Sequence, residues 1–141
     1  MDTHTPPAQN RPLIGLCGRT DPTCEYLLYF RSYAQRVFEA GGLPVGLPYH
    51  ETAAACAPEI AERFDGVLFT GGADIDTASF GGNAYDDRTH HALGQTMPLR
   101  DEFEGALLQA CWDQDVPCLG VCRGVQVMNV GRGGTLVRDV S

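Results

Sequence analysis

A single cysteine between two glycines is the pattern in this chain most suited to chemistry. Cys122 stands two residues after Gly120 and two residues before Gly124. A short apolar run, 116–121, leads into it, and a segment with helical spacing, 123–131, follows it. This order of strand, tight turn and helix is typical of a nucleophile elbow, in which a side chain at either glycine position would crowd the turn. The pattern predicts a nucleophilic thiol at the carboxyl end of a strand.

The expected position of Cys122 at the start of a helix also bears on its reactivity. Unpaired N–H groups and the positive end of the helix dipole favour the thiolate, which is the nucleophilic form of cysteine. A buried structural cysteine is the alternative for Cys122, and it is the interpretation that we adopt for Cys118. No nearby His or Cys completes a four-ligand set with these two residues, so we expect no metal site.

A second glycine-rich turn follows another apolar run. Residues 65–70 read as a strand and lead into the turn 71–73, which contains Gly72. Because the carboxyl ends of parallel strands meet at one edge of a sheet, this turn and Cys122 are expected to face one crevice. There the backbone N–H groups of the turn, with the N–H of Arg123, predict an oxyanion hole for acyl transfer. Asp74 and Asp76 are expected to be turn or cap residues.

The remaining elements are those needed to position the two turns. Apolar runs at 12–17, 43–48, 65–70 and 116–121 predict strands, and they alternate with helical spacing at 29–40, 51–64, 98–115 and 123–131. This alternation predicts an α/β domain with a doubly wound, mainly parallel sheet, and the continuously apolar strands suit a sheet covered on both faces. We expect residues 1–11 to form a flexible tail and residues 12–141 to form one domain.

Composition and charge exclude several classes of function. The formal net charge is −8, which argues against nucleic acid or an anionic membrane as a partner. No apolar run approaches the roughly 18 residues of a spanning helix, and the first residues lack a signal-peptide core. We therefore expect a cytoplasmic protein in which cysteines stay reduced. Four of its six cysteines are predicted to be buried free thiols: Cys17, Cys56, Cys111 and Cys118.

Taken together, the segments resemble the class I glutamine amidotransferase-like superfamily, and within it the gamma-glutamyl-gamma-aminobutyrate hydrolase branch. The resemblance covers nearly the whole chain after Arg11. It rests on RPLIGL, EAGGLPVGLP, FDGVLFTGGADID, RDEFEGALLQA, PCLGVCRGVQVMNV and GGTLVRD, in that order. It implies a flavodoxin-like fold and a hydrolase of polyamine catabolism that cleaves gamma-glutamyl amides, without a cofactor, through a thioester at Cys122.

The resemblance also implies roles for other residues. It places the oxyanion donors at the backbone N–H groups of Ala73 and Arg123. It brings Gln126 into contact with the gamma-glutamyl group, the alternative being an ordinary exposed glutamine of a helix. Arg100 and Asp101 match a recurrent pair, for which we expect a helix-start or packing role.

Three positions depart from the family pattern. Thr77 stands where the family usually has proline, and Gly131 and Arg132 replace an alanine and an apolar residue. A glycine inside a helix costs about 1 kcal/mol relative to alanine. The departures indicate a diverged member of the family.

The resemblance further implies a catalytic His and Glu in an H-x-E segment after later strands, and the sequence stops at Ser141 before such a segment. His90 and His91, in the loop after the glycine turn, are a hypothetical substitute base, although histidines in a polar loop are usually only solvated. We therefore expect the N-terminal portion of a longer enzyme, with a sheet incomplete on its C-terminal side and no activity by itself. An open edge at 116–121 is expected to self-associate or to pair with a complementing C-terminal chain.

Two functions compete with the hydrolase. One is a non-catalytic truncated or split subunit that needs a partner to supply the His–Glu segment. The other is a redox-sensing protein, in which an ionised Cys122 thiol is oxidised without any hydrolysis.

Overall fold

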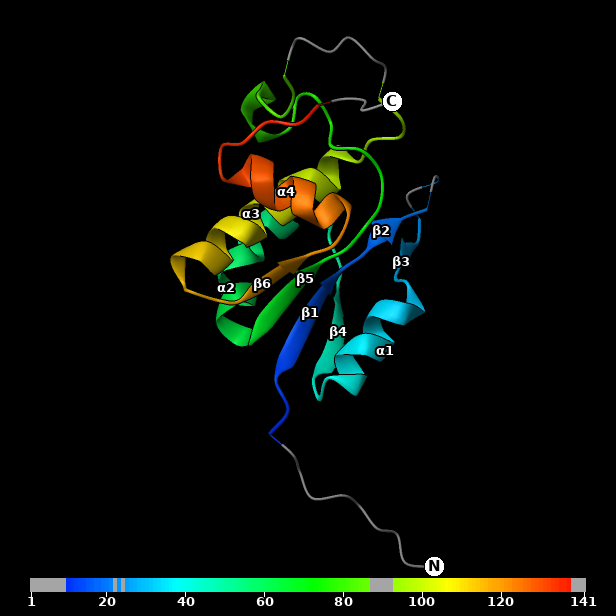
Figure 1. Ribbon diagram of the computed structural model, residues 1–141, viewed down its shortest axis with the longest axis vertical. Coiled ribbons are helices and arrows are strands. Elements are labelled where there is room, and N and C mark those ends of the chain that lie inside the picture. The colour runs from blue at the N-terminus through cyan, green and yellow to red at the C-terminus, as the bar shows by residue number, and fades with distance from the viewer. Residues whose placement is uncertain (1–9, 22, 24, 87–92, 138–141) are drawn as a thin grey trace, which may run out of the picture.

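A four-stranded parallel sheet forms the centre of the protein. The computed structural model describes residues 10–21, 23, 25–86 and 93–137 (Figure 1). The strands follow the order β4-β1-β5-β6 across the sheet, and every neighbouring pair is parallel. Their bounds are Leu13–Cys17 for β1, Leu43–Leu47 for β4, Gly66–Phe69 for β5 and Cys118–Gly120 for β6. This arrangement confirms the predicted flavodoxin-like α/β fold.

Helices cover the two faces of the sheet unequally (Figure 1). Helix α1 (Arg31–Glu39) packs against β1 and β4. The other face carries α2 (Ala57–Arg63), α3 (Pro98–Asp113) and α4 (Arg123–Gly131), with α3 in contact with both of its neighbours. Short 3-10 turns precede α2 at Ala53–Cys56 (η1) and lie between β5 and α3 at Phe80–Gly82 (η2).

Local sequence explains where the main helices begin and end. Pro98 opens α3 at a position where a missing N–H costs nothing. Helix α1 ends at Glu39, and two residues later Gly41 has φ of 91°, which suits glycine; the Gly42 N–H then donates to the Val37 carbonyl at 2.9 Å. This turn leads the chain into β4, which begins at Leu43.

The hydrophobic core lies between the sheet and the helices α2, α3 and α4. All four residues of β5 are buried, and Phe69 is inaccessible to solvent. Leu107 of α3 and Val127 of α4 pack into the same cluster. Because β5 is the strand shared by both neighbours, the turn that follows it is held by a closely packed interior.

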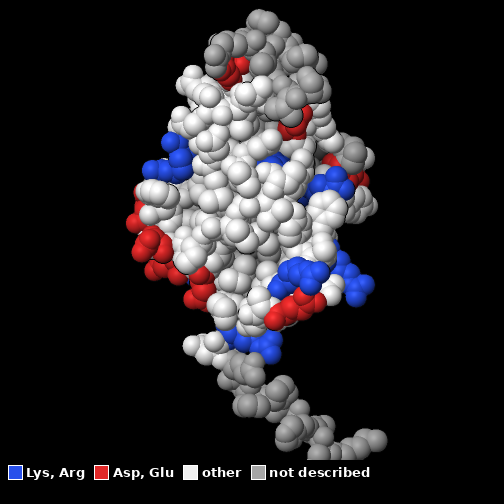
Figure 2. Space-filling model, in the orientation of Figure 1, with Lys and Arg blue, Asp and Glu red and all other residues white. Residues whose placement is uncertain are grey.

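The opposite face is less complete. Strand β6 is an edge of the described sheet, and Leu119 in its centre is 63% exposed. A mostly apolar groove of about 310 Å³ runs beside α1, with Ile14, Val37 and Leu68 among its lining residues. Figure 2 shows uncharged surface across the middle of the visible face, with most charged side chains toward its rim.

Sequence reasoning missed a small second sheet. Strands β2 (Arg19–Thr20) and β3 (Leu27–Leu28) pair antiparallel between β1 and α1. Each is two residues long, which is too short for a hydrophobic period to be recognised. The Asp21 carboxylate accepts the Tyr26 N–H at 2.7 Å and closes the turn between them.

The structure also bears on the predicted burial of the cysteines, on the predicted tail and on membrane-spanning helices. Cys17 and Cys111 are buried free thiols and Cys118 is half-buried, but Cys56 is exposed, so its predicted burial was wrong. The alanine-rich segment 53–63 divides into η1 and α2 and buries only one side, which leaves Cys56 facing solvent. The predicted tail lies almost entirely outside the described residues, which begin at Asn10. In the described part of the chain, every helix is too short or too polar to span a bilayer.

Candidate active site

The junction between β6 and α4 is a strained turn centred on Cys122. This residue has φ of 54° and ψ of −113°, a conformation that residues with side chains rarely adopt. A Cβ atom on Gly124 would lie 2.0 Å from the Phe69 carbonyl oxygen, and one on Gly120 would lie 2.7 Å from the Gly124 carbonyl carbon. Both glycines are therefore required by contact, and the turn has the geometry that the spacing predicted.

The thiol lies beside the glycine turn that follows β5. A Cβ atom built on Gly71 would lie 3.6 Å from the Cys122 Cβ and 3.9 Å from its Sγ. Cys122 itself is exposed, so a reagent can reach the sulfur. The two turns therefore lie side by side at the carboxyl edge of the sheet, where parallel topology brings strand ends together. We call this edge the crevice.

Backbone N–H groups at this crevice are available as donors. The N–H groups of Gly124 and Val125 donate to the carbonyls of Val121 and Cys122, at 2.9 and 3.0 Å. Within the described ranges, the N–H groups of Ala73 and Arg123 have no such partner. Unpaired backbone N–H groups near a nucleophile are what an acyl-transfer intermediate needs, so the prediction of these two donors stays a prediction.

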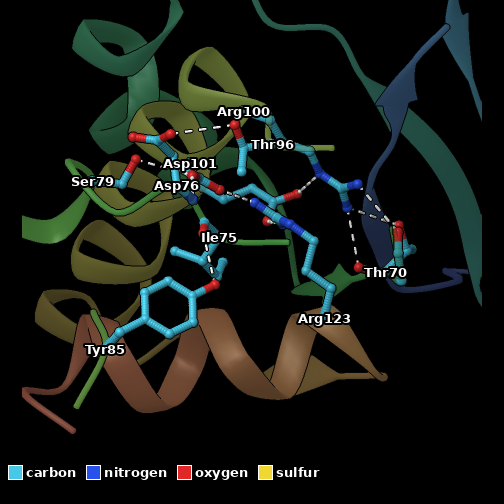
Figure 3. Close-up of polar contacts among 11 residues, drawn as sticks. Thr70, Ile75, Asp76, Ser79, Tyr85, Thr96, Arg100, Asp101 and Arg123 are labelled. Carbon is cyan, nitrogen blue, oxygen red and sulfur yellow. Dashed lines mark hydrogen bonds and ion pairs between the residues drawn. The ribbon is translucent and has the colours of Figure 1, made fainter. Parts of the chain in front are cut away.

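The side chain of Arg123 turns away from the thiol into the interior. It is 1% exposed, and its guanidinium donates to the carboxylates of Asp101 and Glu104 (Figure 3). Burial alone would lower the pKa of Arg123, but the two carboxylates outweigh that effect and raise it. Only the backbone of Arg123 therefore faces the crevice.

Arg100 lies on α3, as do Asp101 and Glu104, and it reaches the glycine turn that follows β5. Its Nε donates to Glu104 at 2.5 Å, and its terminal nitrogens donate to the carbonyls of Thr70 and Gly71 at 3.0 and 3.1 Å. The second oxygen of Asp101 accepts the Asp76 N–H at 2.8 Å and the Ser79 hydroxyl at 2.9 Å. We name Arg100, Asp101, Glu104 and Arg123 the buried ion network.

The sequence predicted a helix-start or packing role for Arg100 and Asp101. In the structure both lie at the start of α3, and they also belong to the buried ion network beneath the site. Glu104 was missed altogether. Its signal was present in the sequence as an Arg-to-Glu pair four residues apart on a helix face shared with buried apolar residues. Such a pair usually lies on the surface, so spacing alone does not reveal that it is buried.

Tyr33 is a second residue that sequence reasoning did not connect with the site. Its spacing indicated only a helix face. In the structure its hydroxyl accepts the Gly71 N–H at 3.3 Å, across the crevice from the network. The glycine turn is thus held by α1 from one face of the sheet and by α3 from the other.

A polar hollow of about 220 Å³ adjoins the glycine turn. Its lining residues are Arg19, Thr20, Gly72, Ala73, Asp74, Gln95 and Met97. The Arg19 guanidinium lies over the Phe30 ring, 5.2 Å from its centroid, and has no carboxylate partner in the part of the chain that the structure describes. Asp74 forms an isolated parallel bridge with Thr96, and its carboxylate accepts the Gly94 N–H at 2.7 Å, so it joins two distant segments and does not cap a local turn as the sequence predicted. The lining of the hollow therefore includes both a cationic and an acidic residue, Arg19 and Asp74.

Of the remaining residues that the sequence proposed for the site, the structure describes some and not others. Gln126 is half-buried, one turn into α4, and its contact with a substrate stays a prediction. His90 and His91 lie outside the described residues. His50 bonds to the Thr52 N–H at 3.3 Å. Among described residues, neither a His nor a carboxylate hydrogen-bonds the Cys122 thiol, and none of their His, Cys, Asp and Glu side chains cluster as a metal site would require.

Cys118 has a different environment from Cys122. It faces the covered side of the sheet, where a hydrogen bond from Cys111 lowers the pKa of Cys118 against the effect of burial. The same bond and burial raise the pKa of Cys111. This pair belongs to the interior between β6 and α3, so the structural interpretation of Cys118 agrees with its position.

Comparison with known proteins shows which family the chain belongs to. The family model described as peptidase C26 matches residues 12–141. The chain is 34% identical over 135 residues to a putative glutamine amidotransferase of Mycobacterium tuberculosis, covering 90% of this chain and 42% of that protein. It is 29% identical over 140 residues to a putative glutamine amidotransferase-like protein of Rickettsia prowazekii, covering 94% of this chain and 47% of that one.

A relative with a more specific name is more distant. The gamma-glutamyl-gamma-aminobutyrate hydrolase of Escherichia coli K12 is 26% identical over 139 residues, which cover 93% of this chain and 50% of that enzyme. The chain therefore spans about half the length of the curated relatives that it matches.

Proposed function

The chain belongs to the peptidase C26 family, which is class I glutamine amidotransferase-like, and from this premise we propose that it carries the nucleophile half of a gamma-glutamyl amide hydrolase. The observation that carries the proposal is the strained, accessible Cys122 next to the glycine turn at Gly71. The N–H groups of Ala73 and Arg123 have no backbone partner among the described residues, which supports a role as donors. A backbone this strained persists only where its surroundings hold it, and such residues cluster at active sites.

The proposed reaction has two steps. The Cys122 thiolate attacks the gamma-carbonyl carbon, and the N–H groups of Ala73 and Arg123 donate to the resulting oxyanion. When the C–N bond breaks, the thiol's proton leaves with the amine, and a thioester remains on Cys122. Water then cleaves the thioester to release the gamma-carboxylate and to return the proton to the sulfur.

Substrate binding is proposed for the surfaces next to these donors. Gln126 would contact the gamma-glutamyl group from α4. The hollow beside the glycine turn suits the alpha-amino and alpha-carboxylate groups of a gamma-glutamyl end, because Arg19 and Asp74 both line it. The guanidinium would pair with the carboxylate and Asp74 with the ammonium group.

Proton transfer needs a base, which we propose to be a histidine oriented by a carboxylate. The exposed β6 edge and the apolar groove beside α1 favour a second polypeptide segment at this face, since an unpaired apolar edge invites strand addition. A segment that docked there would reach the crevice from the side that the described helices leave open. This observation also favours the second candidate function, a subunit that is catalytic only when such a segment is supplied.

Acyl transfer can be tested without that base by using a gamma-glutamyl nitrophenyl ester, whose leaving group needs no proton. Intact-mass analysis with peptide mapping should find one gamma-glutamyl adduct on Cys122, and none in Cys122→Ala. Cys56→Ala is the matched control, since Cys56 is also exposed. Adduct on other cysteines in proportion to their exposure, or no adduct at all, would contradict the proposal. Oxidation of Cys122 by peroxide without acylation would favour the redox-sensing alternative.

A further inference from the structure

The two turns of the candidate site are joined through the interior by charged side chains. The elbow at Cys122 follows β6, and the glycine turn at Gly71 follows β5. Strands β5 and β6 pair directly, but the last registered pair is Phe69 with Gly120, so the ladder ends before either turn. The last hydrogen bond between the strand ends runs from the Val121 N–H to the Phe69 carbonyl at 2.9 Å. Beyond that bond, the spacing of the turns depends also on contacts from outside the sheet.

One branch of the connection begins at the elbow. Arg123 is the residue after Cys122, and its guanidinium donates to the carboxylates of Asp101 and Glu104 on α3. Its Nε has no partner in the described part of the chain, so these two contacts alone anchor the guanidinium. The backbone N–H of the same residue is one proposed oxyanion donor.

The other branch begins at the glycine turn. Arg100 donates to the carbonyl oxygens of Thr70 and Gly71, the two residues just before Gly72. A Cβ atom on Gly72 would lie 2.4 Å from Nη1 of Arg100 and 3.7 Å from Cδ of Arg123. Glycine at this position thus lets both arginines pass directly beneath the turn that holds the other oxyanion donor.

The two branches meet at Glu104, which contacts both arginines. One carboxylate oxygen accepts from Arg100 at 2.5 Å, and the other accepts from Arg123. Neither turn is a hydrogen-bond partner of Glu104 itself. We propose that Glu104 is a positioning residue that fixes the spacing of the two oxyanion donors by clamping Arg100 and Arg123 together; this inference rests on the proposed function.

Physical arguments favour positioning over stability as the role of this network. The four side chains carry two positive and two negative charges, and their exposed fractions are 0% for Arg100 and Glu104 and 1% for Asp101 and Arg123. Buried ion networks are often no more stabilising than apolar residues of similar volume, because desolvation offsets their attraction. They do fix geometry, since bidentate guanidinium–carboxylate contacts restrict both distance and angle. An oxyanion hole needs its donors held within about 0.5 Å.

The test shortens the clamp and keeps its charge. Glu104→Asp removes one methylene, so the carboxylate can no longer reach both arginines. Glu59→Asp is the matched control, because Glu59 pairs with Arg63 at the same four-residue spacing on the exposed side of α2. Arg100→Lys is a second variant, which retains the charge but loses most bonds to Thr70 and Gly71, in case Glu104→Asp does not fold.

Two reagents separate positioning from a general loss of structure. Alkylation of Cys122 by iodoacetamide needs the thiolate but no oxyanion hole, whereas acylation by the gamma-glutamyl ester needs both. We expect Glu104→Asp to slow acylation by about 10- to 100-fold, the loss typical of a misplaced group. Its alkylation rate should stay within about twofold of the unmodified protein's, because the sulfur keeps its position at the helix start. Equal losses in both rates, or unchanged acylation, would overturn the proposal.

A readout independent of activity keeps the inference apart from the proposed function. Amide resonances of the 71–73 turn and of Cys122–Gly124 should shift together in Glu104→Asp and stay in place in Glu59→Asp. Shifts confined to α3 would refute the clamp. If the unmodified protein forms no acyl adduct, the proposed function fails, and the joint shift of the two turns still decides whether Glu104 couples them.

Discussion

The two faces of the sheet are built to different degrees. The face covered by α2, α3 and α4 holds the core, the buried ion network and the strained turn at Cys122. On the other face, of the helices described, only α1 packs against the sheet, and Leu119 of β6 is 63% exposed. The comparison teaches that the reactive turn at Cys122 is backed mainly by the helices of one face, whereas α1 contributes one hydrogen bond, from Tyr33 to the neighbouring glycine turn.

The largest difference in stability is expected between a buried and an exposed charge on the helices of the covered face. Glu104→Gln would leave Arg100 and Arg123 buried with an incomplete set of carboxylates, so we expect a loss of about 3–5 kcal/mol in the free energy of unfolding. The exposed counterpart Glu59→Gln should cost less than about 1 kcal/mol. Urea unfolding monitored by circular dichroism measures both. Similar losses would mean that the network is solvated and not buried.

Two glycines of neighbouring elements give the next test. Gly124→Ala would place a methyl group 2.0 Å from the Phe69 carbonyl oxygen, so a loss of about 3 kcal/mol is expected, at the upper end for overpacking. At Gly66, which lines the groove on the open face, the nearest atom to a new Cβ is the flexible end of Ile14 at 3.2 Å. Gly66→Ala should therefore cost under about 1 kcal/mol. Thermal unfolding compares the two, and a reversed order would contradict the tight elbow.

A buried thiol on the covered face predicts an alkaline loss of stability. Burial, aided by the nearby Glu104 carboxylate, raises the pKa of Cys17 well above its usual range. The unfolded chain releases this proton above about pH 8.5 and the folded chain does not, so stability is full below that pH and falls as pH rises. The loss should reach about 2 kcal/mol at pH 10. Cys17→Ala should flatten the slope between pH 8 and pH 10 by one proton; an unchanged slope would assign it to other groups.

The smallest effect on stability is expected on the open face. Leu119→Lys replaces a side chain that is already 63% exposed, so its cost should be within about 0.5 kcal/mol. It should nevertheless reduce self-association, because a charge on an edge strand opposes strand pairing. Sedimentation velocity at several concentrations measures this. A monomer before and after the change would show that β6 does not pair with a second copy.

Most of the fold follows from local patterns. Four apolar runs bounded by glycine or proline predicted the four main strands, although their burial differs. Strand β5 is fully buried and β1 is mostly buried, whereas β4 and β6 are partly exposed, so the expected cover on both faces holds only for the central strands. The helix at 123–131 was predicted at its observed bounds, because the glycines and Cys122 mark its start. The helix expected at 29–40 begins at Arg31 instead, since Phe30 adopts an extended conformation that sequence spacing does not encode.

The candidate site was predictable only in its backbone. Small residues at Gly120 and Gly124 can be read directly as a steric requirement, and parallel strands bring their carboxyl ends together. Tyr33 and Glu104 are separated from the glycine turn by 38 and 33 residues, and no local period connects them. Their roles depend on which helix face meets which strand, a choice made by packing.

The sequence by itself determined that a thiol would stand on a glycine-flanked turn between a strand and a helix, because bond geometry and side-chain volume act over a few residues. Only the tertiary structure decided that the side chain of Arg123 points inward, that Glu104 joins it to Arg100, and that α1 is the only described helix on one face of the sheet. Those outcomes depend on which side chains are buried. Burial of a charged side chain cannot be read from its local sequence, because it depends on partners from distant segments.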